Sequence, residues 1–202
     1  MTTALLAGLL AGYAIAIPVG AVGVYLVGLT ARTNLRVGLS AALGVATVDG
    51  AYALVAVLGG AVLAPVVVHY AEPVRLVSAA VLLAVAVAVL RGTSRRDEPG
   101  GRVTTSPRAY WTLVGLTLVN PTTVVYFAAL VVGHSGEVTA TPSRAVVFVT
   151  AAFAASASWQ CLLAGGGAVL GRALSGPRGR VATAVVSSAV IAAFAVRLAV
   201  GG

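Results

Sequence analysis

The chain has few charged residues and almost none of the groups that soluble enzymes and metalloproteins use. Charged residues make up 9% of its 202 residues, against about 25% in soluble domains. Lysine is absent, only five residues are acidic, and Cys161 is the single cysteine. One cysteine excludes an internal disulfide and any CxxC metal site, and His69 and His134 fall in separate predicted loops. HExxH and GxSxG motifs are also absent, so we do not expect an enzyme.

Long apolar runs are abundant instead. Hydrophobic residues make up 59% of the chain, and the mean hydropathy is +1.03. A helix needs about 20 apolar residues to cross roughly 30 Å of hydrocarbon, and six runs are long enough: 4–29, 37–63, 74–90, 109–133, 144–170 and 181–200. The sequence therefore predicts an all-α integral membrane protein, with six transmembrane helices in one domain (1–202). The net charge is +8, but the sequence has no soluble domain on which this charge could form a nucleic-acid-binding patch.

The arginines predict the topology. Ten of the thirteen lie between the first and second, third and fourth, or fifth and sixth runs, which leaves Arg75, Arg144 and Arg197 for the other side. The positive-inside rule then makes the arginine-rich loops cytoplasmic and turns both termini outward. The first residues lack the basic region of a signal peptide, so we interpret them as the start of a true first span. Arginine without lysine, together with abundant Ala, Val and Gly, indicates a GC-rich bacterial genome. We therefore expect the protein in the cytoplasmic membrane of a bacterium.

The longest polar segment, 92–108, is predicted to be a cytoplasmic linker between two three-helix halves, 1–91 and 109–202. Binding of anionic lipid headgroups is the alternative interpretation of this segment. Because each half has three spans, the second half enters the membrane from the opposite face. The halves would then form an inverted repeat, as in many secondary transporters.

The sequence gives the inverted repeat limited support. The first and fourth runs each hold a proline followed by an aliphatic stretch with a tyrosine, although the proline-to-tyrosine spacings differ. Segment 42–54 can also be laid over segment 152–164, which pairs Asp49 with Trp159. The repeat is a hypothesis at this point.

Asp49 is the one acid that lies within an apolar run. An aspartate at the centre of a membrane helix costs roughly 2.5–3.5 kcal/mol, so such a residue usually faces a bundle interior or a water-filled path. The other residues on its helix face are mostly small, with Tyr52 about one turn away. Small residues allow close helix contact, so this face should point inward. A structural carboxylate bonded to Tyr52 or to a neighbouring helix is the alternative.

The stretch LVNPTTVVYF (118–127) interrupts the fourth run. A residue before proline is pushed away from the α region, so we expect Asn120 to be an N-cap and Pro121 to start a new half-helix. Thr122 and Thr123 would form its first turn. A half-helix that begins in mid-membrane presents free N–H groups and a positive dipole end, which suit a carboxylate.

Four polar or helix-breaking positions are predicted to lie near the membrane midplane. At about 1.5 Å per helical residue, each lies roughly 18–21 Å from the nearest predicted cytoplasmic arginine, and somewhat less from the hydrocarbon boundary. They come from four different runs: Pro18, Asp49, Asn120 and Ser158.

Proline and glycine also shape the other runs. Pro18, with Gly20 close behind it, could start a half-helix like that at Pro121, and a simple kink is the alternative for both prolines. The segments 8–12 (GLLAG) and 167–171 (GAVLG) fit the GxxxG pattern. In so glycine-rich a chain we expect them to mark internal packing, with a homodimer contact as the alternative.

At these residues the sequence resembles the lysine exporter (LysE) family, which includes the homoserine/threonine exporter branch. The similar features are the length, the six spans, the linker and the motifs IPVGAVG (17–23), GLSAALGVATVDGAYAL (38–54) and NPTTVVYF (120–127). The resemblance implies an exporter of amino acids or related small solutes that is driven by the proton-motive force and needs no cofactor. The sequence departs from the family pattern in two places. The second proline after Pro18 is missing, and Thr122 stands where the family often has a lysine residue. We therefore do not infer from the resemblance that free lysine is the substrate.

These arguments together predict secondary-active amino-acid efflux by proton antiport. The carboxylate of the solute would meet the half-helix N-termini at Pro121 and Pro18, and its ammonium would approach Asp49, for which outside protons compete. Metal-cation efflux and a non-transporting structural or assembly role are the alternatives. Under the leading prediction of amino-acid efflux, neither a metal nor a nucleic acid is expected to bind. The candidate residues for binding or coupling are Asp49, Asn120, Pro121, Thr122, Thr123, Pro18, Gly20, Tyr52, Ser158 and Trp159.

Overall fold

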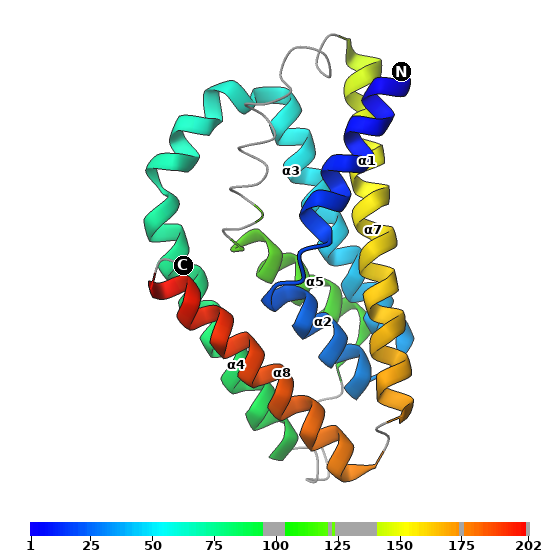
Figure 1. The fold of residues 1–202 in the computed structure, drawn as a ribbon, viewed down its shortest axis with the longest axis vertical. Helices are drawn as coiled ribbons and strands as arrows, with labels where there is room; N and C mark the ends of the chain where they lie inside the picture. The colour runs from blue at the N-terminus through cyan, green and yellow to red at the C-terminus, as the bar shows by residue number, and fades with distance from the viewer. Residues whose placement is uncertain (95–103, 121–122, 124–140, 174–175, 201–202) are drawn as a thin grey trace.

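The computed structural model describes residues 1–94, 104–120, 123, 141–173 and 176–200, and every regular element in these ranges is an α-helix. Figure 1 shows the helices as one bundle in which segments far apart in the sequence lie side by side. The helices are α1 (Thr2–Ala16), α2 (Ala21–Arg32), α3 (Leu35–His69), α4 (Ala71–Ser94), α5 (Ser106–Leu118), α7 (Pro142–Ala173) and α8 (Pro177–Val200).

Within the described ranges, two helices are long and apolar enough to cross a bilayer. They are Leu35–Gly59, which is most of α3, and α7. The pair α1 and α2 adds a third span if it is counted as one bent unit. The chain is thus built as a helical membrane protein, and the arrangement with six spans stays a prediction.

The first apolar run is divided into two helices. α1 ends at Ala16, α2 begins at Ala21, and the two are bent by 75° at this break. Pro18 lies in the connection, where its missing N–H and its ring do not interrupt a helical hydrogen-bond ladder. The corresponding break predicted at Pro121 lies outside the described residues.

α5 ends at Leu118, and side chains from two other helices bind the carbonyls at this end. The Tyr52 hydroxyl on α3 donates a hydrogen bond to the Leu118 carbonyl at 2.8 Å. The Ser78 hydroxyl on α4 donates another to the Val119 carbonyl. Because the last carbonyls of a helix have no intrahelical partner, these bonds allow α5 to stop just before Asn120 without exposing unpaired backbone groups.

Glycines bring α1 and α2 close to α7. A Cβ atom added at Gly8 or Gly12 would collide with the backbone of α7, and one added at Gly167 or Gly171 would collide with the backbone of α2. Both GxxxG segments therefore lie at contacts inside one chain, where small residues allow backbones to approach.

α4 and α8 run side by side on the other side of α2 from α7 (Figure 1). Ala21 of α2, Ala86 of α4 and Ile191 of α8 are buried together there, and Phe194 packs against them. α3 contacts both α5 and α7, and its helical geometry is interrupted at Gly59. The bend of the first run therefore lies between an α3–α7 wall and an α4–α8 wall.

Candidate functional site

A cavity of about 640 Å³ opens beside the bend between α1 and α2. Small-molecule sites occupy roughly 300–1,000 Å³, so this space suits a small solute with some water. The lining includes apolar side chains such as Ile15, Leu82, Leu116 and Phe194. Its polar and charged side chains are Asp49, Ser78, Thr117, Asn120, Thr123, Gln160 and Arg197.

Asp49 is the acidic group of this lining. It is 4% exposed, and the Ser156 hydroxyl of α7 donates a hydrogen bond to its Oδ2 atom at 2.6 Å. Within the described part of the chain, Asp49 has no other hydrogen bond and no ion pair. A buried carboxylate without a cation is costly, so a cationic group of a solute or a proton in the cavity would stabilise it.

The N-terminus of α2 supplies a positive end to the cavity. Gly20 is its N-cap and provides no side-chain acceptor. Among the described residues, the first N–H groups of α2 therefore have neither a helical nor a side-chain acceptor. Ala21, Val22 and Gly23 line the cavity. A Cβ atom at Gly20 would meet nothing within 4 Å. These N–H groups and the helix dipole can bind an anionic group.

Arg197 of α8 adds a cation that the sequence did not predict at this site. It is exposed, lines the cavity one turn after Phe194, and has no ion pair or hydrogen bond within the described residues. From the positive-inside rule, we predicted that Arg197 lies on the outer side of the membrane. The packing of Phe194 near Ala21 is what brings the end of α8 to the cavity, and no local sequence signal shows this.

Gln160 of α7 is a second polar residue that sequence reasoning missed. It is 6% exposed, and its Oε1 atom is buried with no hydrogen-bond partner among the described residues. An unpaired buried acceptor costs about 1–3 kcal/mol. The sequence signal that could have identified Gln160 is its position one helical turn after Ser156. This spacing puts both residues on the face of α7 that borders Asp49.

The structure brings five of the predicted site residues to one cavity and places three elsewhere. Pro18, Gly20, Asn120 and Thr123 line the same space as Asp49. Pro121 and Thr122 lie outside the described residues. The remaining three do not line the cavity: Tyr52, Ser158 and Trp159.

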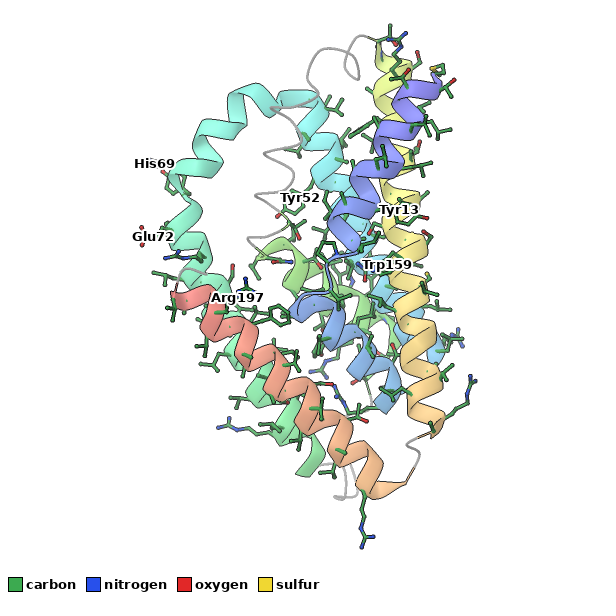
Figure 2. The ribbon with its side chains drawn as sticks, in the orientation of Figure 1. Tyr13, Tyr52, His69, Glu72, Trp159 and Arg197 are labelled. Carbon is green, nitrogen blue, oxygen red and sulfur yellow. The ribbon has the colours of Figure 1, made fainter. Side chains whose placement is uncertain are left out.

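The three residues outside the lining have other surroundings. Tyr52 bonds the end of α5, not the Asp49 carboxylate. Ser158 lies 2.9 Å from the Tyr13 hydroxyl and donates to the Ala155 carbonyl, so it joins α7 to α1. Figure 2 shows Trp159 on the α7 side of the bundle and Arg197 on the α8 side.

A membrane-spanning helical bundle with a buried carboxylate beside an internal polar cavity has the architecture of a transport protein. The chain matches the LysE type translocator family over residues 13–202, nearly its whole length, and it belongs to that family. Neither a curated protein nor a solved structure matched the chain. The protein is thus a multi-pass membrane transporter of a family of translocators, which implies a small solute as its cargo.

Proposed function

We propose that this protein exports amino acids, or closely related small zwitterions, across the bacterial cytoplasmic membrane in exchange for protons. The observation that carries the proposal is the position of Asp49, whose buried carboxylate borders a cavity of about 640 Å³ and bonds Ser156 alone within the described chain. An amino acid offers an ammonium group for this carboxylate. Its own carboxylate suits the α2 N-terminus and Arg197, which line the same cavity.

Competition at Asp49 provides the coupling. The carboxylate can hold a proton or pair with the ammonium of a solute, and binding of one weakens binding of the other. When the cavity opens outward, an entering proton releases the solute, and when it opens inward, loss of the proton restores the site. Moving one positive charge outward against an inside-negative potential costs about 2.3 kcal/mol per 100 mV, so an entering proton offsets this cost for a cationic solute.

The helix pairing supports movement of the two halves against each other. α3 contacts α7 and α4 contacts α8, so each pair joins a helix of the first half to one of the second. In an inverted repeat of two three-helix halves, the partners in each pair would be counterparts. An inverted repeat with both termini outward predicts such pairs around a central site. Rocking of the halves would expose the cavity to one side of the membrane and then to the other.

Export from proteoliposomes with an imposed pH gradient tests the proposal. Wild-type protein should release a loaded amino acid faster when the receiving side is acidic. Asp49→Asn keeps the size of the side chain and removes the titrating group, so we expect the dependence on the gradient to disappear. Glu72→Gln, which changes a surface acid 3.6 Å from Arg75, is the matched control and should export like the wild type. Wild-type proton exchange by Asp49→Asn would refute the role of the carboxylate.

A further inference from the structure

Gln160 is the second hydrogen-bond acceptor on the α3–α7 wall of the cavity. It is buried to more than nine-tenths, and its Oε1 atom has no partner within the described residues. Unpaired buried polar atoms are few in native proteins, and each one calls for a physical explanation. The Oε1 atom is closed off from the cavity as it lies, but Gln160 lines that cavity. A half-turn of the side-chain amide exchanges Oε1 and Nε2, and a bound solute can then supply the missing partner.

The neighbours of Gln160 indicate what that solute group is. One turn earlier on α7, Ser156 fixes the Asp49 carboxylate by its hydrogen bond. Asp49 and Gln160 thus place a charged acceptor and a neutral acceptor on one wall of the same cavity. A primary ammonium has N–H donors for both of them, whereas a trimethylated ammonium has the charge and no donor.

We infer that Gln160 is a specificity-determining residue, which accepts a hydrogen bond from the primary ammonium group of the solute while Asp49 balances its charge. This inference rests on the proposed function and names the substrate class more closely. Amino acids with a free ammonium are transported, and their N,N,N-trimethyl forms are discriminated against. The charge of Asp49 attracts both kinds of solute, but only the primary ammonium can also donate hydrogen bonds to Asp49 and to Gln160. Gln160 therefore contributes to the preference for the primary ammonium.

Competition in proteoliposomes measures this preference. Export of one labelled amino acid is inhibited with neutral amino acids and with their N,N,N-trimethyl forms. The wild type should prefer the primary ammonium by at least about tenfold, because a hydrogen bond to a charged group is lost on methylation. Gln160→Leu should narrow that preference by about tenfold, whereas Gln160→Glu, which keeps an acceptor oxygen, should preserve it.

Thermal unfolding separates recognition from a structural role. Gln160→Leu removes an unpaired buried acceptor, so its melting temperature should equal or exceed that of the wild type. Ser188→Ala is the matched control, because Ser188 is 2% exposed, has an unpaired hydroxyl within the described residues and does not line the cavity. It should keep both the wild-type preference and the melting temperature.

The possible failures are distinguishable. A wild type that exports no amino acid refutes the proposed function. A wild type that exports amino acids, together with a Gln160→Leu variant that keeps the full preference for the primary ammonium, refutes the role of Gln160 alone. A Gln160→Leu variant that unfolds, or that melts lower with an unchanged preference, also refutes it, because the amide would then be needed by the fold.

Discussion

The contact of α7 with α1 and α2 and the cavity beside it differ in how their space is filled. At the contact, backbones lie so close that a single added carbon at Gly12 or Gly167 would collide with a neighbouring helix. At the cavity, a carbon added to Gly20 would meet nothing within 4 Å. Both regions belong to the same few helices, and the lining of the open one includes charged and polar groups as well as apolar side chains. The cavity is therefore a site between closely packed helices, and adding atoms to the two regions should have opposite consequences.

The largest effect is expected at the packed contact. Gly167→Ala forces a methyl group against the Val27 carbonyl of α2, so we expect the free energy of unfolding to fall by about 1–3 kcal/mol. Its neighbour Gly166 has nothing within 4 Å of an added Cβ atom, so Gly166→Ala should be neutral or stabilising by up to about 1 kcal/mol. Thermal unfolding in detergent compares the two variants. Equal effects would mean that close packing does not define this contact.

A carboxylate placed at the cavity should change binding and leave folding intact. Gly20→Asp caps the free N–H groups of α2, which favours the helix. The same carboxylate takes the place proposed for that of the solute, so the apparent affinity for amino acids should fall about tenfold, or about 1.4 kcal/mol. Gly20→Asn adds a similar volume without charge and should lose less affinity. If Gly20→Asp binds amino acids as the wild type does, the α2 N-terminus does not hold the solute.

The smallest effect is expected at Arg197. Because this guanidinium is exposed, water screens its attraction for an anion, and removing it should cost about 1 kcal/mol at most. In the competition assay, Arg197→Gln should weaken the inhibition of labelled amino-acid export by unlabelled amino acids roughly three- to fivefold. Inhibition by the matched primary amines, which lack a carboxylate, should not change. An equal loss of inhibition by amino acids and by amines would show that Arg197 affects the shape of the cavity and does not attract the carboxylate of the solute.

Composition and single-residue arguments predicted the membrane class and the acid at the site. Asp49 could be identified because an isolated acid in an apolar run must find polar surroundings. Pro18 marked the connection at which the first run divides, because proline lacks the N–H that a helix interior requires. These inferences depend on single residues and need no knowledge of which helices become neighbours.

The helix faces that meet at the cavity could not be predicted in the same way. Depth counting selected Ser158, yet the serine that bonds Asp49 is Ser156. Two residues along a helix correspond to about 200° of rotation, so these serines lie at a similar depth on nearly opposite faces. Gln160 was missed for the same reason, and Arg197 was missed because only tertiary packing brings the end of α8 to α2.

Labelling of a cysteine at Gly20 tests the central claim most directly, that the space beside the α1–α2 bend binds the transported solute. In a Cys161→Ala background, a small water-soluble thiol reagent should modify Gly20→Cys, and an excess of transported amino acid should slow that modification. Thr105→Cys, at the exposed start of α5, should react at the same rate with or without the amino acid. If a variant that still transports reacts at Gly20→Cys equally fast with and without the amino acid, the solute binds elsewhere and the account is wrong.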